Sequence, residues 1–293
     1  MKINPRQQAN NNGQLHIELY EIKLVIYFRP ISFFEDLKKH SHEVKNDMQR
    51  MNRVVLGTAQ IGMPYSFSTN LPSFQKSLSI LDRSYELGIR RLDTAAVYGH
   101  SERRIGDWLR LSPSKRTVKI TTKLRKLPSF DTAGEVETFV RMELEQSCKR
   151  LDSDKIDGYM AHEFRDILNA RVQEALFEAQ SQGRIDKFGA SCYDPYEILT
   201  ARENCTTCNL FQIPANILDR RLYEIVPKMQ SLDSQFKQAQ VMIRSIFARG
   251  IITSTTTLSR NTSHLRKPIA LIHEMAKFYE LSLPAFCLNY ILS

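Results

Sequence analysis

A repeated alternation of short apolar strands with longer helical stretches runs from residue 53 to the last residue of this chain. It constrains the possible folds more than any other feature, because strands that alternate with helices form a parallel sheet with helices packed outside it. The pattern predicts seven strands, at Arg53–Leu56, Ile89–Leu92, Val118–Thr122, Ile156–Ala161, Ile185–Gly189, Leu210–Ile213 and Gln240–Ser245.

The helices expected between and after these strands have the apolar periodicity of amphipathic segments. In Glu135–Leu151, for example, an apolar stripe at helical spacing indicates core packing rather than a cofactor site. The predicted helices are Phe74–Gly88, Ser101–Leu111, Glu135–Leu151, Asp166–Gly183, Pro195–Ala201, Tyr223–Ser231, Pro268–Leu281 and Leu283–Leu292.

Four chemically active side chains follow the carboxyl ends of three of the strands: Asp93, Tyr98, Lys123 and His162. If the strands are parallel neighbours, these ends share one rim, and a carboxylate, a phenol, an amine and an imidazole meet there as a proton-donating site. Taken singly, a lysine at a strand end is usually a solvated surface residue, and a histidine there is usually a cap or a core residue. An open doubly wound sheet is the alternative, but no GxGxxG motif follows the first strand. The placement of the four residues favours a (β/α)8 barrel.

The strings around these residues resemble those of the aldo-keto reductase family, and the resemblance covers residues 53–293. Leu92-Asp93-Thr94-Ala95-Ala96-Val97-Tyr98-Gly99 is similar to the family's strand-2 signature, and Gly189-Ala190-Ser191 to its strand-5 signature. The four residues match the family's catalytic tetrad in chain order. The resemblance implies a (β/α)8 TIM barrel and NAD(P)H-dependent reduction of an aldehyde or ketone.

The resemblance also implies a role for each tetrad member. Tyr98 would donate a proton to the carbonyl oxygen, and the ammonium of Lys123 would lower the pKa of that phenol. Asp93 would hold Lys123 in place. His162 would orient the substrate carbonyl through a hydrogen bond.

Cofactor-binding positions carry over from the family in the same way. Ser191 and Gln212 match residues that contact the nicotinamide carboxamide, although Cys192 stands where an asparagine is usual. Arg244 occupies the place of an aromatic that stacks on the nicotinamide, so its guanidinium is expected either to stack or to bind phosphate. The expected cofactor-binding residues are Gly57, Thr58, Ser191, Gln212, Arg244, Ser245, Phe247 and Arg249. NADP(H) is favoured over NAD(H).

The seventh predicted strand is followed only by two helices, and the string Asn289-Tyr290-Ile291-Leu292-Ser293 matches the family just before its eighth strand. We therefore expect a barrel that lacks its eighth strand and last helix. Such a barrel would have two unpaired strand edges and low stability. It would also lack the loop that forms much of the adenosine pocket, so cofactor binding is expected to be weak.

Residues 1–47 resemble nothing in the family and are expected to be a dispensable extension, with the barrel domain spanning residues 48–293. This extension contains one strong strand-forming run, Leu19–Phe28. The alternative is that it adds a strand or hairpin that covers part of the barrel.

Composition narrows the other possibilities. The net charge is +9, but Lys and Arg are spread along the chain. Short basic runs such as Arg103-Arg104 and Lys149-Arg150 are predicted to be ordinary helix faces. Nucleic-acid binding is therefore not expected. No apolar run reaches the length of a membrane span, and no export signal precedes the five scattered cysteines, which predicts a cytoplasmic protein. Cys205 and Cys208 have CxxC spacing without a second pair, so no metal site is predicted.

Two other functional classes remain open from the sequence. One is a non-catalytic relative whose barrel serves as an interaction or nucleotide-sensing module. The other is an isomerase or lyase, although no metal triad or phosphate-binding glycine-rich motif accompanies the strands. The sequence does not identify the carbonyl substrate or the oligomeric state.

Overall fold

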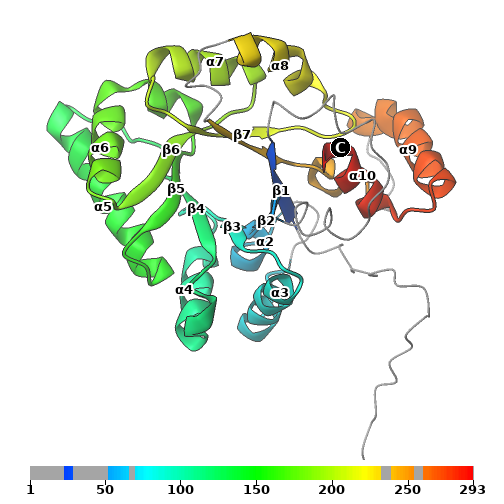
Figure 1. The fold of residues 1–293 in the computed structure, drawn as a ribbon, viewed down its shortest axis with the longest axis horizontal. Helices are drawn as coiled ribbons and strands as arrows, with labels where there is room; N and C mark the ends of the chain where they lie inside the picture. Colours follow the sequence, from blue (N-terminus) through cyan, green and yellow to red (C-terminus); the bar gives the residue numbers. More distant parts are fainter. Residues whose placement is uncertain (1–22, 29–51, 66–69, 232–238, 254–259, 293) are drawn as a thin grey trace, which may run out of the picture.

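The structure is a computed structural model of the whole chain, and it describes residues 23–28, 52–65, 70–231, 239–253 and 260–292. Its centre is a closed ring of strands in the order β1 to β8, and helices surround that ring (Figure 1). The seven strands β2 to β8 are parallel, each pairing with the next along the chain. The expected seven-stranded parallel barrel is therefore confirmed.

The strands lie within a few residues of their predicted positions. They are β2 (Val54–Gly57), β3 (Arg91–Asp93), β4 (Lys119–Leu124), β5 (Ile156–Ala161), β6 (Ile185–Ser191), β7 (Leu210–Pro214) and β8 (Gln240–Arg244).

Helices follow most of these strands and shield the outer surface of the ring. After the short α2 (Ala59–Gly62) come α3 (Phe74–Glu86), α4 (Ser101–Leu111), α5 (Ala133–Leu151), α6 (Ala170–Ser181), α7 (Pro195–Asn204), α8 (Arg221–Ser231), α9 (Arg266–Phe278) and α10 (Leu283–Leu292). The 3-10 helix η4 (Phe164–Leu168) takes up the start of the predicted helix 166–183. Capping boxes begin α5, at Thr132, and α7, at Asp194, and they fix where these helices start.

The register of the strands determines which side chains point into the barrel. Paired residues lie on the same face of a sheet, and faces alternate along each strand. Lys123 pairs with Met160, Met160 with Gly189, and Ser191 with Gln212. By this alternation the residues at the carboxyl ends that face inward are Gly57, Asp93, Lys123, His162, Ser191, Gln212 and Arg244. The register thus gathers the predicted site residues at one mouth of the barrel.

Strand β1 (Lys23–Phe28) comes from the N-terminal segment and closes the ring. It pairs antiparallel with β2 on one side, where Lys23 meets Gly57, and with β8 on the other, where Ile26 meets Ile243. The expectation of two unpaired edges was therefore wrong. The edge backbone groups of β2 and β8, which would otherwise be unpaired, are paired with β1. The N-terminal segment therefore adds a strand to the barrel, as the alternative expectation stated.

Buried apolar side chains fill both the inside and the outside of the ring. A small cluster of Val55, Met160, Leu210 and Met242 fills the barrel interior below the rim. Gly189 is needed at this level, because a Cβ there would lie 1.8 Å from the carbonyl oxygen of Leu210. The larger cluster lies between the strands and the helices and includes Trp108, the only tryptophan of the chain.

The basic runs predicted to be ordinary helix faces turn out to be partly structural. Arg150 on α5 donates to buried Glu102 on α4 at 2.5 Å, and Thr122 of β4 donates to the same carboxylate at 2.6 Å. Arg104 donates to the backbone carbonyls of Ile61 and Pro72. These contacts hold α4 against its neighbours. In each of the two basic runs, one arginine therefore makes structural contacts instead of pointing into solvent.

Candidate active site

Asp93 and Lys123 form a buried ion pair at the mouth of the barrel. The Lys123 Nζ atom donates to Asp93 Oδ1 at 2.7 Å and to the carbonyl oxygen of Thr94 at 2.8 Å. The Lys123 side chain is only 1% exposed and the Asp93 side chain 6%. β3 and β4 place the two residues side by side, because they are neighbouring strands with inward-facing ends. The sequence-based expectation of this contact matches the geometry.

Tyr98 and His162 lie next to this pair. Their rings meet edge to face, with centroids 5.8 Å apart and an interplanar angle of 88°. The Lys123 ammonium lies 5.3 Å from the centroid of the Tyr98 ring. Tyr98 lies in the loop after β3, and His162 directly follows β5, so three different strands bring the four side chains together.

The pKa of Tyr98 differs from the expectation. Burial raises the pKa of the phenol above its ordinary value of about 10, and the Asp93 carboxylate raises it further, while the Arg244 guanidinium acts in the opposite direction. The net direction is therefore opposite to the expected lowering of the Tyr98 pKa. The physical reason is burial, which disfavours the charged phenolate more than the nearby positive charge favours it.

His162 and Lys123 are both pushed toward their neutral forms. Burial lowers the pKa of His162 to about 4, and the positive charges of Lys123 and Arg244 add to this effect. Burial also lowers the pKa of Lys123, while Asp93 opposes that shift. At neutral pH, His162 is therefore an uncharged imidazole with one N–H to donate.

A second layer of hydroxyl groups supports the tetrad, and the sequence analysis did not find most of it. Thr58 donates from both its backbone N–H and its hydroxyl to the Asp93 carbonyl, at 2.9 and 2.8 Å. Ser101 donates to Thr58, and Thr94 donates to Ser101. Thr58, which was expected beside the nicotinamide, is 1% exposed, and its two hydrogen bonds hold the end of β3. Serine and threonine are common residues, so no sequence pattern separates these from others.

Ser191 and Gln212 lie beside the tetrad with polar atoms still available. Gln212 donates from Nε2 to Asp93 Oδ1 at 3.0 Å, which leaves its Oε1 atom without a hydrogen-bond partner among the described residues. Within the same described part of the chain, the Ser191 hydroxyl makes no hydrogen bond. An acceptor and a hydroxyl at the rim suit a ligand with a primary amide. Gly57 pairs with Asp93 at the same level of the barrel.

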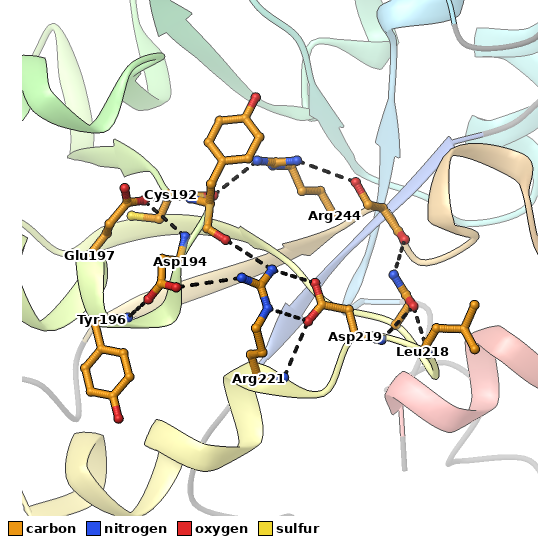
Figure 2. A network of polar contacts seen from close by, with 11 residues as sticks. Cys192, Asp194, Tyr196, Glu197, Leu218, Asp219, Arg221 and Arg244 are labelled. Carbon is orange, nitrogen blue, oxygen red and sulfur yellow. Dashed lines mark hydrogen bonds and ion pairs between the residues drawn. The ribbon is translucent and has the colours of Figure 1, made fainter. Parts of the chain in front are cut away.

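Arg244 ends β8 and reaches across to the loop after β6 (Figure 2). Its Nη2 atom donates to the carbonyl oxygen of Cys192 at 3.1 Å, and the guanidinium lies 4.4 Å from the centroid of the Tyr193 ring. Ser245 follows with a positive φ of 61°. The structure thus brings Arg244 into the site, and its stacking partner within the chain is Tyr193.

The other expected cofactor residues of this loop lie further along it. Phe247 is half-buried and packs against the outer core, while Arg249 is exposed with a positive φ of 58°. Asn216 accepts from the backbone of Leu218 and Asp219 and donates to the carbonyl of Ser245, so it shapes the turn after β7.

With this geometry in hand, comparison with known proteins identifies the relatives of the chain. The sequence model of the aldo/keto reductase family matches residues 53–293. The chain belongs to this family. An uncharacterised oxidoreductase of Bacillus subtilis is 29% identical over 190 residues, which are 61% of this chain and 58% of that protein. A family relative named NADH-specific methylglyoxal reductase, from Escherichia coli, is 28% identical over 230 residues, 71% of this chain and 67% of that one.

Solved aldo/keto reductase structures share the fold. A glycerol dehydrogenase from Gluconobacter oxydans superimposes with a TM-score of 0.63 at 23% identity, over 81% of this chain and 78% of that one. A Bacillus halodurans aldo-keto reductase in its holo form gives a TM-score of 0.58 at 24% identity, over 74% and 70% of the two chains. The matched region spans between about half and two thirds of the first curated relatives, at 58%, 49% and 66% of their lengths.

No helix in the described ranges is both long and apolar enough to cross a membrane. No group of three or more His, Cys, Asp or Glu side chains there is arranged to hold a metal ion. Cys205 and Cys208 are both buried between α7 and β7.

Proposed function

We propose that this protein reduces an aldehyde or ketone to an alcohol, with Tyr98 as the proton donor and NADP(H) as the cofactor. The observation that carries the proposal is the meeting of Asp93, Tyr98, Lys123 and His162 at one mouth of the barrel, with the Asp93–Lys123 pair at 2.7 Å. Membership of an oxidoreductase family supports it. The proposed substrates are small carbonyl compounds, and the proposed location of the protein is the cytoplasm.

The residues present fit a nicotinamide group. The Oε1 atom of Gln212 and the Ser191 hydroxyl can accept from and donate to a carboxamide. Gln212 donates to Asp93 in the barrel mouth, and Ser191 pairs with Gln212 on the neighbouring strand. When bound, the cofactor supplies the hydride to the carbonyl carbon. The protein's own contribution is orientation of the carbonyl and a proton for its oxygen.

Each tetrad member then has a defined task. Neutral His162 donates a hydrogen bond to the carbonyl oxygen and fixes its direction. Tyr98 transfers its phenolic proton to the same oxygen as negative charge develops there. The raised pKa of Tyr98 keeps the phenol protonated before the reaction. Lys123 lies near enough to stabilise the phenolate that remains, and Asp93 keeps the lysine in position.

The test is the substitution Tyr98→Phe, measured with an aldehyde and NADPH. Loss of one positioned proton donor lowers kcat by about 10²–10⁴-fold. The Kd for NADPH, measured by calorimetry, is expected to stay within about threefold. Tyr196→Phe is the matched control, since Tyr196 is an exposed phenol on α7. Near-normal turnover in Tyr98→Phe would remove Tyr98 from the acid role, and a tighter Kd for NADH than for NADPH would overturn the cofactor assignment.

A second candidate function is a barrel that binds nucleotide or a partner without turnover. The observation that favours it is β1, an antiparallel strand from the N-terminal segment, in the place where a (β/α)8 barrel has its eighth parallel strand. This candidate predicts measurable NADPH binding and no reduction of any aldehyde by the unmodified chain, whereas steady turnover excludes it.

A further inference from the structure

Two cysteines that the proposed reaction does not use, Cys205 and Cys208, lie together in a tight turn. Cys205 caps the C-terminal end of α7, and the turn runs through Thr206 and Thr207 before β7 begins. The Cys208 backbone N–H donates to the Cys205 carbonyl at 3.1 Å, which is the hydrogen bond of a β-turn. Such a turn holds its end Cα atoms within about 7 Å, and a disulfide joins Cα atoms about 4.4–6.8 Å apart.

Contacts with neighbouring elements fix the end of this turn. Arg202 on α7 donates to the Cys208 carbonyl at 3.0 Å. The next residue, Asn209, donates from its backbone to the Phe188 carbonyl at 3.0 Å, and its side-chain oxygen accepts from the Phe188 N–H at 3.3 Å. The turn is thus held by both α7 and β6. The two thiols, which are hydrogen-bonded to each other, are already side by side in the reduced protein.

The Cys205 sulfur accepts hydrogen bonds from four donors of its own turn. They are the Cys208 thiol, the Thr207 hydroxyl at 3.5 Å, and the backbone N–H groups of the same two residues. The Cys208 thiol, followed by the other donors, lowers the pKa of Cys205 to about 6 against the effect of burial, so Cys205 is largely a thiolate at neutral pH. The negative end of α7 opposes this charge less strongly than the direct donors favour it. The same thiol–thiol hydrogen bond raises the pKa of Cys208, which stays protonated.

The turn lies just below the protein surface. Thr206 and Thr207 are exposed, whereas Cys205 is 3% exposed and Cys208 is fully buried. Because the exposed Thr207 touches the Cys205 sulfur, that sulfur lies one side chain below solvent, within reach of a small oxidant. Cys208 needs no such access, since its partner is Cys205.

The other three cysteines of the chain differ from Cys205 in their charge. Burial raises the pKa of each, so they remain thiols at neutral pH, and a thiol is a much weaker nucleophile than a thiolate. They are Cys148, Cys192 and Cys287.

We propose that Cys205 and Cys208 are a reversible oxidation site, at which a peroxide converts the two sulfur groups into a disulfide. The Cys205 thiolate attacks one peroxide oxygen, so that an S–O bond forms, the O–O bond breaks, and hydroxide leaves and takes a proton from solvent. The Cys208 sulfur then attacks the Cys205 sulfur. The S–S bond forms, and the S–O bond breaks with loss of a water that carries the Cys208 proton. Two electrons pass from the sulfur atoms to the peroxide, and a dithiol reverses the change.

This site is separate from the barrel mouth. Cys208 precedes β7, so the pair lies at the amino end of that strand, whereas the tetrad lies at the carboxyl ends. The oxidation therefore does not depend on the proposed carbonyl reduction.

The test treats the full chain with a slight excess of hydrogen peroxide at neutral pH. The remaining thiols are labelled with N-ethylmaleimide in denaturant, and the peptides are read by mass spectrometry. The expected product is an internal Cys205–Cys208 disulfide, two hydrogens lighter than the reduced peptide, with the other three cysteines labelled. Dithiothreitol should restore labelling at both positions. Full labelling of Cys205 and Cys208 after peroxide would overturn the proposal, and so would earlier oxidation of another cysteine or a bond that forms only in urea.

Two substitutions separate the roles of the pair. Cys208→Ser keeps a hydroxyl donor beside Cys205 and should stop at a sulfenic acid on Cys205, which dimedone labels. Cys205→Ser should abolish oxidation at the turn. Cys287→Ser, on α10, is the matched control and should leave the disulfide yield unchanged. Dimedone labelling of Cys208 in Cys205→Ser, or none of Cys205 in Cys208→Ser, would refute the assignment of Cys205 as the attacking thiolate.

Discussion

The Asp93–Lys123 pair makes a prediction about stability that can be worked out from its burial. With side chains 1% and 6% exposed, the pair is almost fully removed from water. Removing one partner of a buried pair leaves an uncompensated charge and costs about 3–5 kcal/mol. Lys123→Met leaves the Asp93 carboxylate with Gln212 as a remaining donor, and Asp93→Asn leaves the ammonium with the Thr94 carbonyl. We expect each single change to cost at least about 3 kcal/mol.

The double variant should be much less harmful than the sum of the two. Asn and Met at these positions leave no buried charge, so the double change is expected to cost no more than the larger single one. That corresponds to a coupling energy of at least about 3 kcal/mol, at the upper end of the range measured for residues in direct contact. The exposed pair Arg83–Glu86 is a matched control, because its side chains are 62% and 63% exposed. Its coupling energy should be below about 1 kcal/mol.

The assay is urea unfolding of the four proteins, followed by Trp108 fluorescence and by circular dichroism. Trp108 is 2% exposed and anchored to Asp82 by a hydrogen bond of 2.7 Å, so its emission reports loss of the core. Additive effects of Asp93→Asn and Lys123→Met, to within about 0.5 kcal/mol, would refute the claim that the pair acts as a buried unit.

Three further predictions concern the barrel and its mouth. Gly189→Ala should destabilise the fold by about 1–3 kcal/mol or more, because the new Cβ meets the Leu210 carbonyl, while Gly134→Ala, with open space around it, should be neutral in the same urea titration. The contribution of His162 to stability should be constant above about pH 6.5 and fall toward pH 4, because the unfolded chain protonates His162 at its ordinary pKa of 6.5 and the folded chain only near 4. His162→Gln should reduce this dependence of stability on pH. An unchanged dependence would contradict the lowered pKa of His162. A chain beginning at Met48 lacks β1 and should melt at least about 4 °C lower than the full chain by calorimetry, whereas an equal Tm would restore the expectation that residues 1–47 are dispensable.

The parallel part of the fold could be predicted because its signals are local. Each of the seven strands is a short apolar run between amphipathic helices, and β5 and α4 have the bounds that their apolar patterns indicate. β1 was the ambiguous case. The run Leu19–Phe28 reads as a strand, but local sequence does not state which edges a strand will pair with. Pairing of Ile26 with Ile243 depends on the two free edges that the other seven strands leave.

The sequence predicted which residues meet in the site, but it did not predict the direction in which the pKa of Tyr98 shifts. Inward-facing strand ends place Asp93, Lys123 and His162 together, and this follows from strand order alone. The direction of the Tyr98 pKa shift depends on burial and on the nearby charges of Asp93 and Arg244. Both are properties of packing, so they have no counterpart in residue spacing. The supporting hydroxyls of Thr58 and Ser101 depend in the same way on contacts between segments distant in the chain.

The position of β1 also affects the order in which the barrel can form. Its pairing with β2 joins nearby segments, such as Val25 with Val55, but its pairing with β8 joins Ile26 to the distant Ile243. Contacts of such long sequence separation are entropically expensive and slow to form. During synthesis from the N-terminus, β8 emerges after the other strands of the described ring, so the ring can close only once Gln240–Arg244 is available. Until then the β7 edge is open, and barrel closure becomes the late, aggregation-exposed step of folding.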